Sequence, residues 1–510
     1  MKKVKLIIFI SLIILFIIVL FYSIFGTSLS HLSVKDIKED RKLKKDLISE
    51  LKINNVDAIY DKNNNTYYYM VPENYEGNVY ILNLELKDGY KYKIIDETLN
   101  IIKVDYNEFI EVIVYNDKYY FETKIQLTNL PLINIITEET ISFDDTKTIF
   151  NYINSTNSEE IITSNSMMHI RGATSKYFDK KSYKINFYNK SYTDEKKVNI
   201  SNFYYGDSLI LDAVYRDPSK VRNVFATELW NDISNDFSNI NVYSEFVEVF
   251  INSEYKGLYV LTEPINRTKL NLNKSSSIDT SVIIKTTDWR TINDIKESYS
   301  ITEDTFLYYE LKYPNDNDMY EKSWDIALNK LANYYNNVNS YKVIKNSFDI
   351  DNYIDIIIFN AFTNNADNNI KKNNYFYAES LKSEKLYIQP WDMEYTFGLA
   401  FYSKGENLTK KDMKDYDKIY TKFHHENSSE INKLLISRYR ELRKSILTKD
   451  NFDRLLDNYK NKLNKGCALR DSNIWYEYDI EKEIEDIRTW LYNRLDYFDN
   501  YVESLDNEQV

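Results

Sequence analysis

The chain has 510 residues, 43% of them hydrophobic, and a formal net charge of −13. A chain of this length and composition folds into about two to four globular domains. The acidic balance argues against a nucleic-acid binder, because no excess of Lys and Arg is present to neutralise a phosphate backbone. Cys467 is the only cysteine, which excludes an intramolecular disulfide.

The N-terminus carries the pattern of a membrane anchor. Three lysines within the first five residues precede an uncharged run from Leu6 to Phe25. At about 1.5 Å per residue, a run of roughly 20 residues spans the hydrocarbon layer of about 30 Å. The run is longer than the apolar region of a cleaved signal peptide. We therefore expect residues 1–28 to form an uncleaved anchor in the cell membrane, with the basic end inside and the rest of the chain outside.

The next part of the chain changes from charged to β-rich. Residues 29–55 are charged and have a helical pattern, which predicts a stalk. From residue 58 to residue 129, segments such as TYYYMV and FIEVIVY are rich in β-branched and aromatic residues and are separated by turn signals. Residues 29–129 are therefore predicted to form a helical stalk and a small all-β domain.

From Leu130 onwards strands give way to helices. Asp351 is the expected N-cap of a buried helix from Tyr353 to Phe362. Near the C-terminus, apolar residues recur every three or four positions, which indicates one core-facing helical stripe. The members of this stripe are Ile480, Ile484, Ile487, Leu491, Leu495, Phe498 and Val502. The mixture of strands and helices predicts an α+β fold.

Two short predicted strands, Tyr375–Ala378 and Leu386–Ile388, are joined by a polar turn. An antiparallel hairpin returns the chain to the edge where it started. The hairpin therefore gathers three acids and two amides at one rim: Asp367, Asn373, Asn374, Asp392 and Glu394. Oxygen ligands of this kind suit Mg²⁺ or Mn²⁺.

The order of these groups is similar to that of a protein kinase, in which a catalytic Asp is followed by a metal-binding Asn and, after a hairpin, by the Asp of a D-F-G turn. Here Asp367 comes first, and either Asn373 or Asn374 follows it. Asp392 stands after the hairpin, close to T-F-G at residues 396–398. The sequence departs from ordinary kinases in the spacing of the Asn and in having no G-x-G-x-x-G.

Several ordered blocks resemble the CotH kinase family, named for a spore-coat protein. The blocks are LPLINI at 130–135, IRGATSKYFDKKSYKINF at 170–187, DPSKVRN at 217–223, EVFINSEYKGLYVLTEPIN at 248–266, DIDNYIDIIIFNAFTNNAD at 349–367 and PWDMEYTFG at 390–398. The resemblance implies that residues 130–510 form an atypical, two-lobed kinase domain. It implies an enzyme that uses ATP and Mg²⁺ or Mn²⁺ to phosphorylate Ser or Thr of exported, cell-surface or spore-coat proteins.

The resemblance also implies roles for the residues at the rim. Asp367 is the candidate catalytic base or substrate orienter. Asp392 and one of Asn373 and Asn374 are the candidate metal ligands, with Glu394 as a further ligand or a residue that supports one. Phosphoryl transfer also needs a cation against the phosphate charge.

Five residues are candidates for the nucleotide and phosphate side of the site: Arg171, Lys181, Lys184, Glu263 and Lys285. Arg171 is suited to bidentate phosphate binding. Lys181 and Lys184 are three residues apart in a predicted strand, so alternation sends them to opposite faces. Glu263 is expected to pair with one of these cations.

Two other functions remain open from the sequence. The first is a catalytically inactive, kinase-like surface or coat-assembly protein that binds partners, which export would favour because ATP is scarce outside most cells. The second is a metal-dependent hydrolase of surface polymers that uses the same carboxylates. The retained Asp367 and Asp392 favour the kinase.

The anchor predicts one membrane span with the C-terminal part outside the cytoplasm. Protease treatment of intact cells should then remove the part of the chain after residue 28 and leave a cytoplasmic control protein intact. Protection of the whole chain from the protease would contradict this topology.

Overall fold

The computed structural model describes residues 33–44, 51–95, 100–154, 160–172, 174–200, 204–234, 240–276, 281–287, 305–306, 309–314, 330–331, 341–365, 372–378, 385–399 and 428–507. The chain divides into two compact units. The first comprises Met1–Asn134, Tyr152–Ile161 and Phe250–Tyr255, and the second comprises Ile135–Asn151, Ile162–Val249 and Lys256–Val510.

The first unit is β-rich, as predicted. Its strands are β1 (Lys42–Leu43), β2 (Lys52–Ile53), β3 (Val56–Asp57), β4 (Ile59–Asp61), β5 (Thr66–Met70), β6 (Val79–Ile81), β7 (Leu84–Glu85), β8 (Lys91–Ile94), β9 (Ile101–Lys103), β10 (Phe109–Tyr115) and β11 (Tyr119–Thr128). The largest sheet has the order β4-β5-β11-β10-β8, with β1 against β11. The β10–β11 hairpin is closed by the Asn116 side chain, which accepts hydrogen bonds from Lys118 N and Tyr119 N at 2.9 and 2.8 Å.

In residues 33–44 and 51–55, the described part of the predicted stalk, the chain is only partly helical. The described helix, α2 (Val34–Glu39), is a single short element that begins at a capping box between Ser33 and Asp36. The chain then forms β1, which pairs in parallel with β11. Pairing with an existing sheet satisfies the backbone groups of this segment, so the helical pattern ends earlier than expected.

The tip of the hairpin between β19 (Ser244–Ile251) and β20 (Glu254–Thr262) belongs to the first unit. Tyr68 packs against the rings of Phe250 and Tyr255, with centroids 4.9 and 5.0 Å apart. Lys62 pairs with Glu254 at 3.0 Å. These aromatic and ionic contacts hold the hairpin tip in the core of the β-rich unit.

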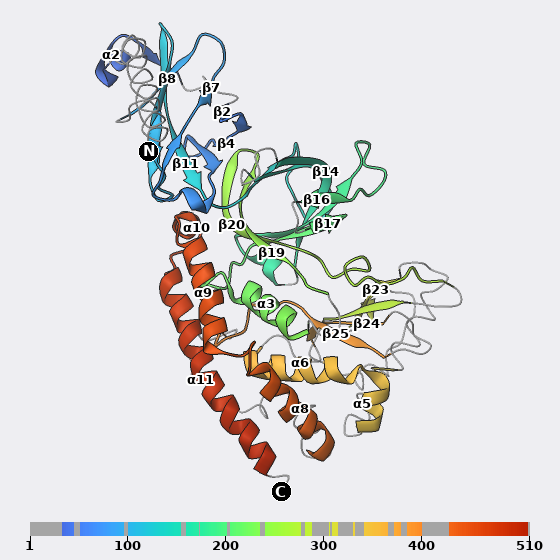
Figure 1. Cartoon of the computed structure of the whole chain (residues 1–510). Coiled ribbons are helices and arrows are strands. Elements are labelled where there is room, and N and C mark those ends of the chain that lie inside the picture. The colour runs from blue at the N-terminus through green and yellow to red at the C-terminus, as the bar shows by residue number, and fades with distance from the viewer. Residues whose placement is uncertain are drawn as a thin grey trace, which may run out of the picture. The chain divides into compact units, whose positions relative to one another are not determined.

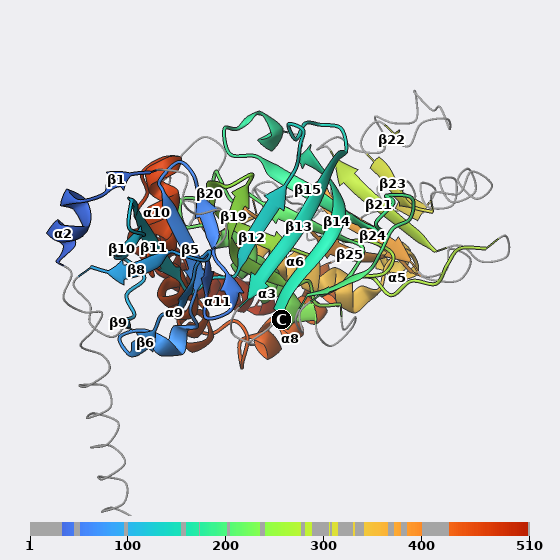
Figure 2. The same ribbon diagram turned by 90° about the horizontal axis from the view of Figure 1, so that it is seen from above.

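Most of a closed barrel belongs to the second unit. Its strand order is β12-β13-β14-β15-β18-β20-β19, and Figures 1 and 2 show it from two directions. The further strands are β12 (Leu132–Ile136), β13 (Thr146–Asn154), β14 (Glu160–Arg171), β15 (Ser182–Tyr188) and β18 (Ser208–Asp212), with β16 (Val198–Ile200) and β17 (Tyr204–Gly206) forming a separate pair. Arg171 lies opposite Ser182, and Tyr183 lies opposite Leu211, so the ends of β14 and β18 meet at one end of the barrel.

The rest of the second unit combines a sheet with helices. The sheet has the order β22-β23-β21-β24-β25, formed by β21 (Val282–Thr287), β22 (Thr305–Phe306), β23 (Tyr309–Tyr313), β24 (Lys372–Ala378) and β25 (Tyr387–Pro390). The helices are α3 (Arg222–Ser234), α5 (Tyr341–Ser347), α6 (Ile350–Thr363), α8 (Ser428–Leu442), α9 (Lys449–Leu463), α10 (Cys467–Ile474) and α11 (Ile480–Asn507). The α+β prediction is therefore confirmed.

The predicted membrane anchor, residues 1–28, lies outside the described residues. Within the part of the chain that the structure describes, no helix combines the length and the apolar character that crossing a bilayer requires.

Helix α6 is the buried helix expected from the sequence, but its N-cap is Asp349 and not Asp351. The Asp349 carboxylate accepts a hydrogen bond from Asn352 N at 3.1 Å. The N-cap lies two residues earlier than expected because the backbone of Asp349 is already fixed by a bond from its N–H to Leu386 O. Asp351 then lies in the first turn, where a carboxylate favours the helix dipole.

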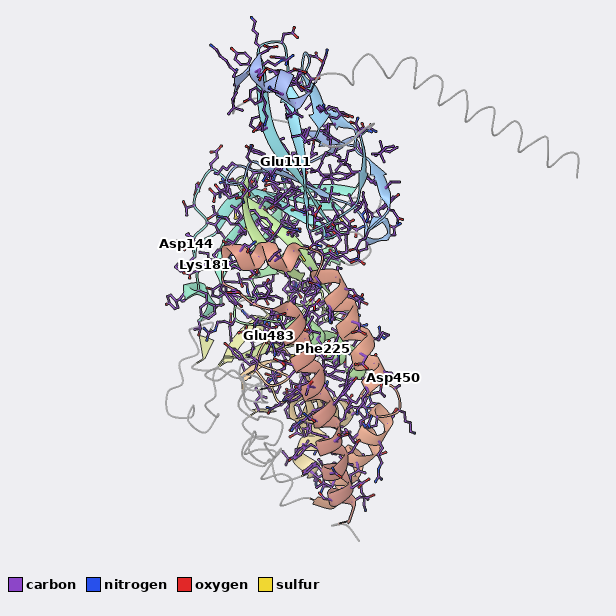
Figure 3. The ribbon with its side chains drawn as sticks, turned by 90° about the vertical axis from the view of Figure 1, so that its left-hand side faces the viewer. Glu111, Asp144, Lys181, Phe225, Asp450 and Glu483 are labelled. Carbon is purple, nitrogen blue, oxygen red and sulfur yellow. The ribbon has the colours of Figure 1, made fainter. Side chains whose placement is uncertain are left out.

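The C-terminal helix confirms the predicted apolar stripe. All seven of its predicted members are buried, with Ile484 and Phe498 fully excluded from solvent. The helix runs beside α9 (Figure 1). Further inside, the Phe225 ring of α3 (Figure 3) lies 6.2 Å from the Phe452 ring of α9 and 4.8 Å from that of Phe397. Helices α3, α9 and α11 thus share one core with the turn that follows β25.

One buried charge on α11 holds the end of α6. The Arg494 side chain is 0% exposed, and its Nε donates to Phe362 O at 3.1 Å while Nη2 donates to Ala361 O. The last carbonyls of a helix lack partners within the helix and carry the negative end of its dipole. The guanidinium satisfies both needs and fixes the point at which the chain leaves α6.

Replacing Arg494 by Met should destabilise the protein. The substitution keeps an apolar stem of similar length but leaves two buried carbonyls without their donor, which costs about 1–3 kcal/mol. Arg440→Met is the matched control, because the Arg440–Asp506 pair is about half exposed and such pairs contribute about 0–1 kcal/mol. Urea denaturation of both variants measures the difference, and equal midpoints would contradict the role of Arg494.

A second group of buried charges joins the barrel to α10. Lys180 Nζ donates to Asp471 Oδ1 at 2.6 Å, and Lys220 Nζ lies 3.8 Å from Asp471 Oδ2, with all three side chains 0% exposed. Lys220 also donates to Val214 O and Tyr476 Oη, both at 3.1 Å. With two ammonium groups for one carboxylate, burial lowers the pKa of Lys220 from 10.5 to about 8.

The pKa of Lys220 predicts how stability depends on pH. In the unfolded chain this ammonium keeps its proton up to its ordinary pKa of 10.5, whereas the folded chain releases it near 8. Between these values the unfolded state binds more protons, so the free energy of unfolding contributed by Lys220 rises with pH. The difference in unfolding free energy between wild type and Lys220→Met should therefore shift in favour of wild type from pH 8 to pH 10. A constant difference across this range would contradict the assignment.

Candidate functional site

The predicted hairpin is present as β24 and β25. The two strands are antiparallel, with Asn374 opposite Pro390 and Phe376 opposite Ile388. Helix α6 holds the outer edge of β25, because the Asn352 amide donates to Ile388 O and accepts from Ile388 N at 3.1 and 2.7 Å. The register brings the start of β24 next to the segment that carries Asp392.

The turn after the hairpin is tied to the end of α6. Phe397 N donates to Thr363 O at 3.0 Å, and α6 ends at Asn364 in the left-handed conformation, with φ of 51°. Gly398 has φ of 88°, and a Cβ there would lie 2.8 Å from the Trp490 ring. The T-F-G turn therefore requires a glycine and lies beside the start of the loop that leads to Asp367, which itself is outside the described residues.

Asp392 is held in an unusual backbone conformation. Its φ is +60°, in the left-handed region that residues with a side chain seldom adopt. The next peptide N–H, from Met393, donates to Asn223 Oδ1 at 3.1 Å. Thr396 Oγ1 donates back to Met393 O at 2.9 Å. The Asp392 side chain is exposed and is thus available to a ligand from a turn with a fixed backbone.

Asp392 lines a narrow cleft within the second unit. The residues around it come from four strands of the barrel, from α3, from the segment between α3 and β19, and from β25 and the residues after it. They are Arg171, Ile210, Asp212, Asn223, Thr227, Val242, Ser244, Val260, Thr262, Gln389, Pro390, Trp391, Asp392 and Met393. The cleft has about 30 Å³ of space for water-sized groups, which is enough for about two or three of them. This size and polarity suit an ion or phosphate oxygens.

Asp212 and Asn223 were not anticipated as members of the site. Asp212 ends β18, and Asn223 is the second residue of α3. Asn223 Nδ2 donates to Asp212 Oδ2 at 3.1 Å. One signal in the sequence pointed to this segment, the DPSKVRN block that ends at Asn223. Arg222 in the same block forms a buried ion pair with Asp217 at 2.6 Å.

Among the predicted cations, Arg171 lines the cleft. Lys181 instead donates to the carbonyls of Lys176 and Phe178 and so closes the loop between β14 and β15. Lys184 is in the middle of β15 opposite His169, and burial lowers the pKa of its ammonium.

Glu263 and Lys285 also have structural contacts. The Glu263 carboxylate pairs with Lys269 and accepts from Tyr243 N at 2.9 Å, and burial raises the pKa of this carboxyl. Its cation is thus Lys269 and none of those expected from the sequence. The Lys285 ammonium lies 5.7 Å from the centre of the Tyr375 ring, on strands that pair side by side.

The remaining predicted ligands lie in β24 or follow β25. Asn374 is buried, and its N–H donates to Thr286 Oγ1 at 3.0 Å. Asn373 is described only as a backbone position of β24, and Glu394 is half buried. Among the described residues, no group of three or more His, Cys, Asp or Glu is close enough to hold a metal ion. The oxygen donors of Asp392 and Asp212 nevertheless belong to the type that Mg²⁺ and Mn²⁺ prefer.

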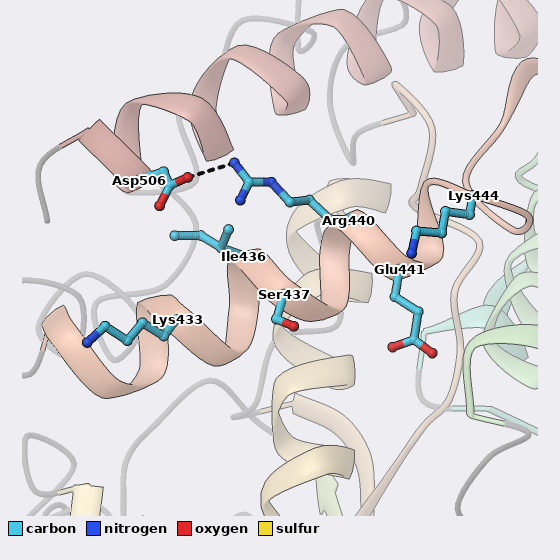
Figure 4. Close-up of a pocket in the computed structure, with 7 residues that line it drawn as sticks. All are labelled: Lys433, Ile436, Ser437, Arg440, Glu441, Lys444 and Asp506. Atoms are coloured by element: carbon cyan, nitrogen blue, oxygen red, sulfur yellow. Dashed lines mark hydrogen bonds and ion pairs between the residues drawn. The ribbon is translucent and has the colours of Figure 1, made fainter. Parts of the chain in front are cut away.

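A wider hollow of about 600 Å³ lies on the surface between α8 and α11 (Figure 4). Its lining consists of Lys433, Ile436, Ser437, Arg440, Glu441, Lys444 and Asp506. Arg440 and Asp506 pair across it at 2.7 Å. It contains none of the residues predicted from the sequence, so the cleft beside Asp392 is the candidate site.

Comparison with known proteins identifies the family. A search of curated proteins gives no match to this chain. The family model described as CotH kinase protein matches residues 168–498. This span begins in β14, ends in α11 and contains every residue that lines the cleft. Because the match covers well over half of the 510 residues, the chain belongs to the CotH kinase family.

Proposed function

We propose that this protein is an ATP- and divalent-metal-dependent kinase that phosphorylates Ser or Thr of exported, cell-surface or spore-coat proteins. The proposal is carried by the arrangement of three parts of the chain: Asp392, Arg171 and the end of α6. Asp392 and Arg171 line the same cleft, and the turn after Asp392 is bonded to the end of α6, where the loop to Asp367 begins. Membership of the CotH kinase family supports the same activity.

In this proposal each group has a separate role. Asp392 and either Asn373 or Asn374 would hold Mg²⁺ or Mn²⁺, which supplies positive charge against the phosphates of ATP. Arg171 would bind phosphate oxygens through its guanidinium. The small volume of the cleft is consistent with phosphates at its base and with the nucleoside further out.

Asp367 would act on the acceptor. It takes the proton of the Ser or Thr hydroxyl as that oxygen bonds to the γ-phosphorus, while the bond from the γ-phosphorus to the bridging oxygen breaks and ADP leaves. Glu394, two residues after Asp392, would serve as a further ligand or support one.

The proposal extends to the arrangement of the chain. The barrel would form one lobe of an atypical kinase fold, and the sheet with α5 to α11 would form the other. The run from Leu6 to Phe25 would anchor the enzyme in the membrane, with its substrates among proteins outside the cytoplasm.

Substitutions of Asp392 and Asp367 should impair the reaction in different ways. Asp392→Asn removes a charge that balances the metal, so Mg²⁺-dependent ATP binding and turnover should both fall. Asp367→Asn keeps the shape but loses the proton acceptor, so ATP should still bind while transfer drops by about 10²–10⁴-fold. ATP titration with Mg²⁺, together with phosphoryl transfer to a panel of surface proteins, measures both effects.

Asp486→Asn is the control for the loss of one negative charge. Asp486 is exposed on α11, and among the described contacts it pairs with Lys482, one turn away. This variant should bind ATP and transfer phosphate like wild type. If Asp367→Asn also transfers phosphate like wild type, the loop after α6 has no catalytic role. If wild type binds partners but transfers no phosphate, the protein is the inactive, partner-binding member.

A further inference from the structure

Both the nitrogen and the oxygen of the Asn223 side-chain amide form hydrogen bonds. Nδ2 donates to Asp212 Oδ2, and Oδ1 accepts from Met393 N, each at 3.1 Å. A carboxylate can only accept and a peptide N–H can only donate. The orientation of the amide is therefore determined by its two partners, and neither Asp nor Leu at this position reproduces both bonds.

The bond to Met393 controls the conformation of Asp392. The Met393 N–H belongs to the peptide that follows Asp392, whose φ is +60°. This left-handed conformation is disfavoured for a residue with a side chain. Rotation of that peptide towards an ordinary conformation would take the N–H away from Asn223. The hydrogen bond thus stabilises the backbone that directs the Asp392 carboxylate.

The other end of the amide is anchored in the barrel. Asp212 Oδ1 accepts from Val214 N at 3.1 Å and from Ser182 Oγ at 3.4 Å. Ser182 Oγ in turn accepts from Ala213 N at 2.9 Å. These bonds fix the carboxylate at the end of β18 and leave Oδ2 to Asn223. A continuous chain of hydrogen bonds therefore connects the barrel end to the peptide after Asp392.

We propose that Asn223 is a positioning residue for Asp392, and that Asp212 acts by fixing the orientation of the Asn223 amide. This inference rests on the proposed kinase function for its catalytic consequence, but its structural part is independent of it. Asn223 acts on the reaction through the backbone of Asp392. A carboxylate displaced by about 1 Å lowers the rate of phosphoryl transfer by about 10²-fold.

Exchanging the two side chains tests the proposal. Asn223→Asp places two carboxylates against each other, and Asp212→Asn removes the acceptor that orients the amide, so each single variant should lose about 10²-fold in transfer. In the double variant the amide at position 212 donates to the carboxylate at position 223, which still accepts from Met393. The double variant should recover at least tenfold over Asn223→Asp, as expected for a coupled pair.

A second measurement does not depend on activity. Hydrogen exchange of the Met393 amide, followed in the full chain, should be slow in wild type and in the double variant and faster in Asn223→Ala. Asn231→Ala is the matched control, because Asn231 lies on the same helix and bonds to Val242 N and O. The Asn231→Ala variant should have a lower melting temperature, while the rate of hydrogen exchange of its Met393 amide should equal that of wild type.

Two results would overturn the proposal. One is a double variant that transfers phosphate no better than Asn223→Asp, which would give Asp212 a direct role in the reaction. The other is wild-type exchange of the Met393 amide in Asn223→Ala. If wild type itself transfers no phosphate, the kinase function fails, whereas the exchange measurement still decides whether Asn223 holds the turn.

Discussion

The geometry of the candidate site depends on the hydrogen bonds that the Arg494 guanidinium makes. The guanidinium is fully buried and donates to the carbonyls of Ala361 and Phe362 at the end of α6. These carbonyls have no partner within the helix, and a buried cation at this end is favoured by the helix dipole. Because the chain turns away at Asn364, the same contact determines where the loop to Asp367 begins.

Helix α11 supports both ends of the hairpin region. Its Trp490 packs on Phe397 of the turn after β25, with ring centroids 5.8 Å apart, and Phe397 N is bonded to Thr363 at the end of α6. From α3, Asn223 holds the peptide that follows Asp392. The exposed carboxylate is therefore carried by a turn fixed from three helices, as a ligand-binding group requires if it is to keep one position.

The two lysines just before β15 show how neighbouring charges take different roles. Lys180 is buried and pairs with Asp471 of α10, while Lys181 binds carbonyls of its own loop. A Cβ at Gly257 would collide with the Asp471 carboxylate, so the close approach of α10 to β20 requires a glycine. The buried pair fixes the base of the loop that follows Arg171, and the cation of the cleft is Arg171.

The sequence by itself determined those parts of the protein that depend on local patterns. The stripe from Ile480 to Val502, the buried helix and the β24–β25 hairpin all follow from residue spacing and turn chemistry, as does the expectation that Asp392 lies at the rim of that hairpin. Only the tertiary structure decided which cation faces the cleft and that Asn223 belongs to it. Strand alternation separates two faces but does not say which of them meets a distant helix, and Lys180 finds its partner 291 residues away. Such pairings depend on how the barrel packs against the helices. The local spacing of residues in the sequence does not reveal this packing.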